Sequence, residues 1–404
     1  MTITARPLRT STLSRKACTS VNVSSWRNAA TTPANPVSVT PSVAIPMSKT
    51  SDGTAASYWR VRCMTAGVRW LAPMLAAAIV ACSAAPSAPA GAASSPPGSA
   101  APSAAKAIWP LRGTEAPSAD ATKRRPIVVR VPNDPTARPQ SGLADADIVF
   151  EMLVEGGITR YAVVFHSRDT QTVGPIRSAR LSDLQYLPML RGILAHVGAS
   201  GPVLDRIRQA AASGQFIDLD QFQHADAYDR VSSRPAPQNV YTSTQRIRDA
   251  AKDNTNVDVP ALEFDAQAPA GGKAVASLVL PYTGAQRVEY RFESNAYSRI
   301  QDGKATLDDA AKKTVAPDNV VIIKTDITEV RSIVEDELGS FSLDIRSTGT
   351  GPVVILRDGQ RYDGTWSREG TDMYRFKDAS GKALKLKPGL TWIHVVPVDF
   401  DTGS

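Results

Sequence analysis

The clearest pattern of apolar and polar positions lies in residues 147–180. Two apolar runs, Ile148–Val154 and Tyr161–Phe165, flank a diglycine turn. A later loop carries a Gly-Pro pair and brings two arginines, Arg177 and Arg180, to the expected start of a helix. Buried strands followed by a charged, glycine-containing loop are how α/β domains present a site. This stretch is therefore the first place to look for function.

Short apolar blocks alternate with helix-like spacing between residues 125 and 252. The expected strands are 126–131, 146–154, 160–167, 193–197 and 216–219, and the expected helices are 181–191, 202–212 and 243–252. Ser182 and Gln185 fit a capping box at the first helix, and Pro188 is expected to weaken or kink that helix. Strands that alternate with helices predict an α/β layer fold.

The pattern changes after a diglycine at residues 271–272. Short strand-like runs follow one another, and Asp-Gly turn signals separate several of them. The expected strands are 275–280, 287–292, 319–325, 341–345, 353–356, 373–377 and 391–396. The sequence thus predicts an α/β N-terminal domain, residues 122–270, followed by a β-rich, antiparallel (α+β) C-terminal domain, residues 271–404.

The first 121 residues lack the pattern of a folded domain. Residues 1–63 have no periodicity and few large apolar side chains, so they cannot supply a core. We expect them to be a disordered or mis-assigned extension, with Met64 as the true start. Residues 83–121 are rich in Ala, Pro and Ser, which is typical of a disordered linker that holds a domain away from its anchor.

Residues 64–82 have the features of a secretory signal. Arg69 supplies a basic start, and a short apolar run follows it. That run is too short for a stable membrane-spanning helix. Ile79–Cys82 resembles a lipobox, so Cys82 is expected to be lipidated and to attach the protein to a membrane. The alternative is an ordinary buried, Ala-rich helix.

The charge distribution argues against nucleic-acid binding. The formal net charge is +7, but residues 1–63 hold eight Lys/Arg and one acid and carry all of it. The remaining residues hold 38 bases and 38 acids. Without a basic excess, no nucleic-acid partner is expected. The three cysteines, Cys18, Cys63 and Cys82, precede the folded part, so no disulfide framework or Cys-based zinc site is expected there.

Arginines are the main candidates for ligand binding. Arg177 and Arg180 lie three residues apart beside Ser178, and Arg160 follows the diglycine turn. Guanidinium groups beside the free N–H groups of a helix start form a natural site for phosphate or carboxylate. The alternative is that these arginines make structural ion pairs with nearby acids. The acids concerned are Glu151, Glu155 and Asp183.

Other polar residues extend this predicted site. Glu151 and Glu155 are expected on the same face of one strand, and acids on an apolar strand need partners. Arg234 and Asn239 lie in a Pro-rich loop. That loop either folds over the site or only connects two elements.

Catalysis is a second hypothesis. His196 ends the strand at 193–197, where it could act as a general base toward Ser200 or water. Glu155 is the other candidate base, and a hydrogen-bonded structural role is the alternative for His196. The sequence lacks G-x-S-x-G, H-E-x-x-H, P-loop and G-x-G-x-x-G motifs in the expected folded part. Its four histidines also lack metal-ligand spacing, so neither a metal nor a cofactor is expected.

Several short motifs are specific enough to indicate a family. In the first part they are Arg138–Leu143, Ala146–Val149 with Glu151, Val154–Arg160, Gly174–Arg180 and Asn239–Ser243, and in the second they are Gly364–Trp366 and Pro388–Ile393. With them, residues 126–249 and 275–397 resemble the YerB-like family of bacterial lipoproteins, which has a two-part domain of unknown function, DUF3048. One departure is Gln238, where the family carries a histidine. The resemblance implies an envelope lipoprotein and no particular reaction.

Trp366 and Trp392 would serve either as a stacking platform for a ligand or as part of the hydrophobic core.

The sequence therefore favours a lipid-anchored protein of the cell envelope that faces the periplasm or the extracytoplasmic space. It would bind an anionic or polar envelope ligand, such as a cell-wall fragment, through its arginines. The alternatives are an envelope hydrolase or transferase using His196 or Glu155, and a scaffold that docks a protein partner. A closed arginine–glutamate network would favour the scaffold. A cleft joining His196 to the arginines would favour the enzyme, and a cleft with arginines but a remote histidine would favour the binder.

Overall fold

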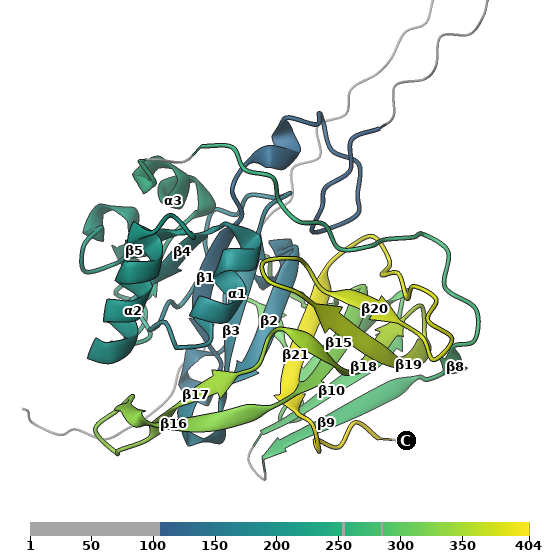
Figure 1. Ribbon diagram of the computed structural model, residues 1–404. Helices are drawn as coiled ribbons and strands as arrows, with labels where there is room; N and C mark the ends of the chain where they lie inside the picture. The colour runs from purple at the N-terminus through teal and green to yellow at the C-terminus, as the bar shows by residue number, and fades with distance from the viewer. Residues whose placement is uncertain (1–105, 253–254, 284–285, 404) are drawn as a thin grey trace, which may run out of the picture. The chain divides into compact units, whose positions relative to one another are not determined.

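The computed structural model describes residues 106–252, 255–283 and 286–403 (Figure 1). The predicted extension, the signal with Cys82 and most of the predicted linker lie outside these residues. Within the described residues, no helix is both long and apolar enough to cross a membrane. The described residues belong to one compact unit.

Eleven strands from both halves of the folded chain form one sheet. The strands from the first half are β1 (Ile127–Pro132), β2 (Ile148–Leu153), β3 (Thr159–Phe165), β4 (Ile193–His196) and β5 (Ile217–Asp220). Those from the second half are β8 (Lys273–Ala274), β15 (Asn319–Thr325), β18 (Gly349–Arg357), β19 (Gln360–Arg368), β20 (Arg375–Lys377) and β21 (Thr391–Pro397). Their order is β20-β19-β18-β15-β21-β2-β3-β1-β4-β5, with β8 beside β19.

Strand β21 joins the two halves. It pairs in parallel with β15 on one side and with β2 on the other. In the first half, β1, β4 and β5 are parallel, whereas β3 is antiparallel to both of its neighbours. In the second half, β15, β18, β19 and β20 are antiparallel. The expected α/β part followed by a mostly antiparallel β part is therefore confirmed.

Helices and a second sheet cover the two faces of the large sheet. The helices are α1 (Asp183–Leu190), α2 (Gly201–Ala212) and α3 (Thr244–Ala250), and the second sheet contains β9 (Ser277–Thr283), β10 (Gln286–Glu293), β11 (Ala296–Gln301) and β12 (Lys304–Ala305). On one face, Leu187 of α1 and Ile207 of α2 share a core with Phe150. On the other face, Ile247 of α3 and Tyr290 of β10 belong to a second core. We call these the α1 face and the β10 face.

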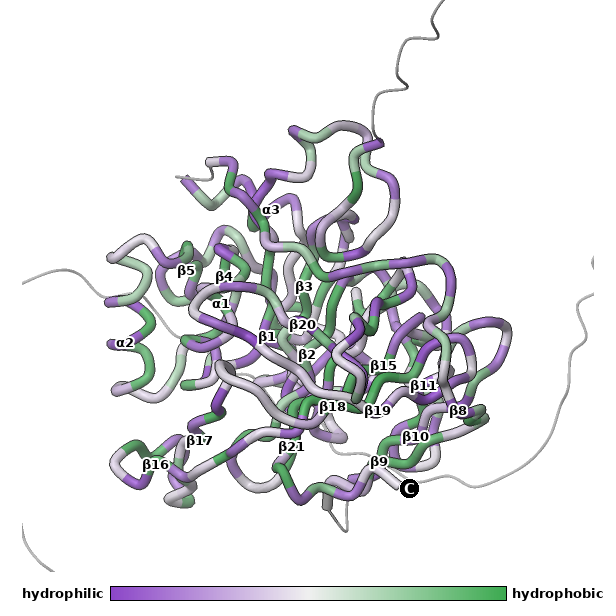
Figure 2. Tube along the Cα trace, turned by 45° about the vertical axis from the view of Figure 1, so that its right-hand side comes forward, coloured by the Kyte–Doolittle hydropathy of each residue, from purple (hydrophilic) through white to green (hydrophobic). Residues whose placement is uncertain are grey.

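Hydropathy follows this layering. Hydrophobic residues gather along strands such as β3 and β15, and α2 alternates hydrophobic and hydrophilic residues along its turns (Figure 2). Helix α2 buries Val203, Ile207 and Ala210 and leaves its other side in solvent. This spacing of three to four residues is why the segment forms an amphipathic surface helix.

Three short strand pairs complete the described fold. They are β6 (Asp229–Arg230) with β7 (Val240–Tyr241), β13 (Leu307–Asp308) with β14 (Lys313–Thr314), and β16 (Ile327–Val334) with β17 (Phe341–Ile345). The β16–β17 hairpin extends from the second half past the ends of β2 and β3 (Figure 1). A short 3-10 turn that follows β2, η4 (Glu155–Gly157), contacts β17.

Two local features differ from the sequence-based expectation. The side chains of Trp109 and Leu111 are buried, and Ile108 forms a β-bridge with Glu115, so residues 106–121 belong to the folded body and not to a linker. The Ser182 hydroxyl makes no capping hydrogen bond. Asp183 instead accepts a 2.8 Å hydrogen bond from the Arg180 backbone N–H, which fixes the approach to α1.

Candidate functional site

The predicted arginine site is a buried cluster of charges on the α1 face. Arg180 lies just before α1 and binds Glu155 of η4 through two hydrogen bonds, of which Nε to Oε2 is 2.6 Å. Arg160 on β3 donates through Nη1 to the Ser178 carbonyl at 2.9 Å and lies 3.8 Å from Glu155. The structure therefore brings together Arg160, Arg180, Glu155 and the backbone of Ser178.

Further charges close this cluster. Arg130 on β1 is fully buried, and its Nη1 lies 3.3 Å from Asp183 of α1. Glu335 follows β16 and lies 3.6 Å from Arg180 Nε with its side chain fully covered. We call Arg130, Glu155, Arg160, Arg180, Asp183 and Glu335 the Arg180 cluster. It holds three arginines and three acids, so its charges balance within the protein.

The electrostatics of Glu155 agree with a structural role. Burial alone would raise the pKa of this carboxyl, but the hydrogen bonds and positive charge of Arg180 outweigh burial and lower its pKa to about 2. A carboxylate with so low a pKa is a poor proton acceptor near neutral pH. None of the five cavities described in the structure is lined by Arg160, Arg177 or Arg180.

Arg177 differs from the other arginines of the predicted site. Its backbone is held by Arg130 and Val197, through hydrogen bonds of 2.9 Å and 3.1 Å. Its half-buried guanidinium makes no hydrogen bond or ion pair to any residue that the structure describes. Of Arg160, Arg177 and Arg180, Arg177 is therefore the one whose charge is available to solvent or to a ligand.

His196 makes its hydrogen bonds to residues outside the Arg180 cluster. It is buried, its Nδ1 lies 2.9 Å from the Gly198 carbonyl, and its Nε2 lies 2.8 Å from Asp218 of β5. Burial would lower the pKa of His196, but the bond to Asp218 and its negative charge raise it. Ser200 has a buried hydroxyl without a partner among the described residues, so it forms no dyad with His196. These contacts favour the structural alternative for the imidazole.

Glu151 lies in a different place from Glu155. The two were expected on one strand face, but β2 ends at Leu153 and the chain turns at η4. Glu151 therefore points to the β10 face, where it is fully buried. The same-face prediction was wrong because it assumed that the strand continued through residue 155.

A polar network surrounds Glu151. Its carboxylate accepts hydrogen bonds from Arg299 Nη2 at 2.9 Å, Trp392 Nε1 at 2.8 Å and Thr159 Oγ1 at 2.8 Å. Asn133 donates to the same carboxylate at 3.2 Å. The guanidinium carbon of Arg299 lies 4.6 Å from the Trp392 ring centroid, a cation–π distance. Trp392 is thus a buried member of the network, and Trp366 is likewise in the core.

His394 extends this network toward the second sheet. Its two ring nitrogens lie 2.5 Å from the Tyr282 hydroxyl and 2.8 Å from the Tyr290 hydroxyl. Burial lowers the pKa of His394 to about 4, and the positive charge of Arg299 acts in the same direction against the opposing Glu151. The imidazole is therefore neutral near pH 7. We call the set that comprises Asn133, Glu151, Thr159, Tyr282, Tyr290, Arg299, Gln301, Trp392 and His394 the Glu151 network.

A cavity of about 590 Å³ adjoins the Glu151 network. It is lined by Asn133, Pro135, Arg138, Pro139, Gln140, Arg299, Gln301, Asp302, Lys304, Ala305, Thr306 and Leu307. These residues come from the loop after β1 and from β11, β12 and the segment that follows them. The cavity therefore lies between the two halves of the chain, at the Arg138–Leu143 motif.

Two residues of this cavity carry buried N–H groups without an acceptor. Gln301 Oε1 accepts from Arg299 Nη2 at 2.6 Å and from Asn133 Nδ2 at 3.1 Å, which fixes the orientation of its amide. Its Nε2 then has no partner among the described residues, and neither has Nε of Arg299. Unpaired buried donors are unfavourable unless something else accepts from them. Both groups are therefore donors that the described residues leave unsatisfied.

The remaining predicted residues support the cavity or lie away from it. Arg234 donates to the carbonyls of Ala137 and Pro139 at 2.8 and 2.7 Å, so it positions the motif loop. Asn239 makes a weak 3.4 Å contact with Arg230. Gln238 donates to Asp134 at 3.2 Å and so has a structural hydrogen bond of its own. In the described part of the chain, no three His, Cys, Asp or Glu side chains are grouped to hold a metal.

Sequence reasoning missed Arg299, Gln301 and His394. Their partners are far away in the chain: Glu151 is 148 residues from Arg299. These residues could have been recognised as charged or imidazole side chains whose neighbours along a predicted strand are apolar. His394, in β21, is an example. Such a group needs a buried partner.

Comparison with known proteins places both halves in one family. Residues 111–257 match the N-terminal domain and residues 278–393 match the C-terminal domain of DUF3048, a protein of unknown function. A protein of Bacillus subtilis (strain 168) named "Putative lipoprotein YerB" is 35% identical over 303 residues, which are 70% of this chain and 84% of that protein. The crystal structure of YerB from Bacillus subtilis has a TM-score of 0.63 and 30% sequence identity, and covers 72% of this chain and 97% of that chain. The chain therefore belongs to the YerB-like DUF3048 family.

Proposed function

We propose that this protein is a lipid-anchored envelope protein that binds an acceptor-rich, anionic or polar ligand in the cavity beside the Glu151 network. The observation that carries the proposal is the pair of unpaired N–H groups, on Arg299 and Gln301, in residues that line a cavity of about 590 Å³. The proposal keeps the expected class of ligand but moves its site from the Arg180 cluster to the β10 face.

Charge supports the chemistry of this ligand. The cavity lining includes Arg138, Arg299 and Lys304, with Asp302 as its one acid. Asp302 is paired with Arg138 at 2.6 Å. Lys304 is exposed and has no ion-pair partner among the described residues. A carboxylate, a phosphate or the carbonyl and hydroxyl oxygens of a cell-wall sugar would suit these donors.

Two observations support the proposed attachment to a membrane of the cell envelope. The relative from Bacillus subtilis is named a putative lipoprotein. In this chain Ile79–Cys82 fits a lipobox and follows a short apolar run. Attachment through Cys82 would hold the cavity at an extracytoplasmic membrane surface, where cell-wall fragments are found.

The enzyme alternative is less well supported than binding. Both nitrogens of His196 already have hydrogen-bond partners, and Glu155 is held as a carboxylate by Arg180. Neither group lines the cavity that carries the unpaired donors. The residues proposed as bases are thus not placed to act on a ligand bound there.

Thermal unfolding of the full chain with and without ligand tests the proposal. The probes are muramyl dipeptide, a disaccharide fragment of peptidoglycan, citrate and inorganic phosphate. A ligand at about 100 times its Kd, bound to the folded state only, adds about 2.7 kcal/mol to the free energy of unfolding. We expect at least one probe to raise the melting temperature.

Replacing an alanine in the cavity lining with tryptophan distinguishes binding in this cavity from binding elsewhere on the protein. Ala305 is exposed and lines the cavity, so Ala305→Trp should fill it while leaving every residue of the Glu151 network unchanged. Ala276, which is also exposed but lies outside the cavity, provides the control Ala276→Trp. The proposal requires the stabilisation to disappear in Ala305→Trp and to persist in Ala276→Trp. Equal stabilisation of both variants, or no stabilisation by any probe, would overturn it.

A further inference from the structure

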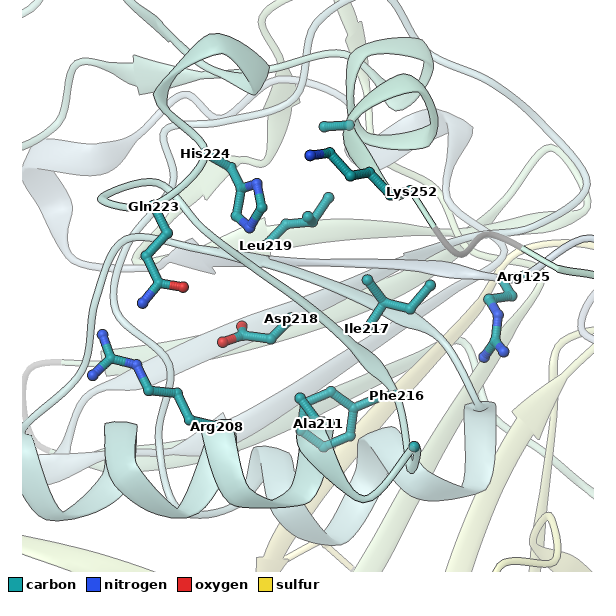
Figure 3. Close-up of a pocket in the computed structure, with 12 residues that line it drawn as sticks. Arg125, Arg208, Ala211, Phe216, Ile217, Asp218, Leu219, Gln223, His224 and Lys252 are labelled. Carbon is teal, nitrogen blue, oxygen red and sulfur yellow. The ribbon is translucent and has the colours of Figure 1, made fainter.

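A groove of about 500 Å³ runs along β5, which is the edge strand of the large sheet at the end opposite β20 (Figure 3). Its floor includes Phe216, Ile217, Asp218 and Leu219. Arg208 and Ala211 of α2 lie on one side, and Lys252, just beyond α3, lies on the other (Figure 3). The strand is therefore open between two helices.

The outer backbone groups of β5 have no strand partner. β5 pairs only with β4, and the hydrogen bonds from Ile217 N to Gly192 O and from Gln221 N to His196 O show which residues face β4. Hydrogen bonding alternates along a strand. Asp218 therefore directs its backbone N–H and C=O away from β4 into the groove, where no described residue pairs with them.

The acidic side chains of β5 do not protect this edge. Natural proteins often protect an edge strand with charged side chains that repel another strand. Here the Asp218 carboxylate accepts from His196 Nε2 at 2.8 Å, and Asp220 accepts from the Gly198 backbone N–H at 2.8 Å. Both carboxylates are therefore bound to the neighbouring strand β4 and its loop, and the backbone edge stays accessible.

The charges around the groove select one kind of strand. The lining contains three cationic side chains, Arg125, Arg208 and Lys252, and a single acid, Asp218, which is already bound to His196. Arg125 is held by the backbone carbonyls of Arg191 and Thr255. Arg208 and Lys252 are exposed and make no ion pair within the described residues, so their charges are free for a partner.

We propose that this groove binds an extended acidic peptide segment of a partner protein, which adds to the sheet as a strand next to β5. Backbone hydrogen bonds to Asp218 would give affinity, and Arg208 and Lys252 would select acidic side chains on the added strand. Phe222, two residues beyond β5, is 70% exposed and would offer the added strand an apolar contact. This binding is independent of the cavity at the Glu151 network.

Fluorescence anisotropy with a labelled peptide tests the proposal on the full chain. The probe is an alternating valine–glutamate hexapeptide, and an alternating valine–lysine hexapeptide of the same length is its control. The valine–glutamate peptide should bind, and its binding should weaken as salt concentration rises, because screening reduces attraction between exposed charges. The valine–lysine peptide should not bind. Equal binding of both peptides, or binding of neither, would overturn the proposal.

Charge reversal on one helix supplies a matched pair of variants. Arg208 and Arg206 are both exposed on α2, but only Arg208 lines the groove. Arg208→Glu should weaken binding of the acidic peptide by about tenfold, whereas Arg206→Glu should change that binding little. An equal loss in both variants would mean that the peptide responds only to general surface charge, and would overturn the proposal.

Hydrogen–deuterium exchange distinguishes strand addition from a loose electrostatic contact. A peptide paired with β5 should slow exchange of the Asp218 amide, because that N–H would then be hydrogen-bonded. Peptide binding without this protection would overturn the proposal that the groove adds a strand.

Discussion

The two buried charge groups of this protein lie on opposite faces of the same sheet, and they differ in what surrounds them. In the Arg180 cluster, three arginines meet three acids and no described cavity is lined by those arginines. Both groups leave buried N–H groups without a hydrogen-bond partner, on Arg130 and Arg160 in the first and on Arg299 and Gln301 in the second, but of these four residues only Arg299 and Gln301 line a described cavity. The arginine motif visible in the sequence is thus internally neutralised, and the more open site is formed by residues far apart in the chain. A row of arginines predicts binding only when their partners are not already supplied by the fold.

The largest effect should come from removing Arg299. The variant Arg299→Met leaves Glu151 as a fully buried carboxylate without its cationic partner, which typically costs about 3–5 kcal/mol. Urea unfolding should show this loss in the free energy of unfolding. The double variant Glu151→Gln/Arg299→Met should recover part of it, because the unpaired charge is gone. A loss for Arg299→Met no larger than that of the double variant would show that the ion pair is not essential to the fold.

A pH-dependent effect of somewhat smaller size should come from His394. Its pKa is about 4 in the folded protein and near 6.5 when unfolded. The unfolded chain therefore binds more protons between these values, and stability should fall as pH decreases from about 6.5 to about 4. A shift of this size corresponds to about 3 kcal/mol. Urea unfolding across this pH range should show the decline.

A substitution isolates the contribution of His394. His394→Gln should reduce the acid-side decline. It should not abolish it, because burial also lowers the pKa of His166 to about 3. His196 acts in the opposite sense, since its raised pKa gives stability that is lost as pH rises through its folded value. An unchanged pH profile in His394→Gln would contradict the assignment.

Removing Arg180 should have an intermediate effect. Arg180→Met removes the hydrogen-bonded ion pair with Glu155, and a hydrogen bond to a charged group contributes about 1.5–3 kcal/mol where nothing replaces it. We expect a loss of about 2 kcal/mol, below that of Arg299→Met, because Glu155 keeps Arg160 nearby and is partly exposed. Urea unfolding of the two single variants side by side gives the comparison. A larger loss for Arg180→Met than for Arg299→Met would show that the Arg180 cluster contributes more to the free energy of unfolding than the Glu151 network does.

The smallest effect should come from Arg177. Its guanidinium has no partner among the described residues, so Arg177→Ala should change the free energy of unfolding by less than about 0.5 kcal/mol. Thermal unfolding of this variant beside Arg180→Met measures the difference between neighbours in one motif. A loss above about 1 kcal/mol would show that Arg177 belongs to the Arg180 cluster after all.

Much of the fold could be predicted where apolar residues dominate a segment. The runs that became β1, β2, β3, β15 and β21 are almost wholly buried, so their pattern reports their structure directly. The expected helices also formed, with ends within two residues of the prediction. In these segments local propensity and tertiary packing agree.

Segments with one polar face were harder to recognise. β19 carries Arg361, Asp363 and Ser367 between its buried residues, and β16 is largely exposed. Such strands form because a neighbouring strand supplies their hydrogen bonds, which no local pattern encodes. Trp109 and Leu111 were likewise hidden by an Ala- and Pro-rich composition, although their burial ties residues 106–121 to the body.

The candidate site was predicted only in part. The Arg138–Leu143 motif and Glu151 lie at the cavity or beside it, and Arg234 holds the motif loop. The deciding residues, Arg299 and Gln301, come from the second half and meet the first only after the sheets pack. Contacts between residues 148 positions apart depend on topology, which a single sequence does not specify.

The position of β21 has a consequence for how the chain reaches its folded state. This strand contains residues 391–397 and lies in the middle of the sheet, between β15 and β2. A chain that emerges from a ribosome or a translocation channel from its N-terminal end therefore lacks its central strand until these residues arrive. Until then β2 and β15 would each expose a long apolar edge, which is a template for aggregation. The two regions matched by separate family models thus become parts of one continuous sheet only when this late strand is in place.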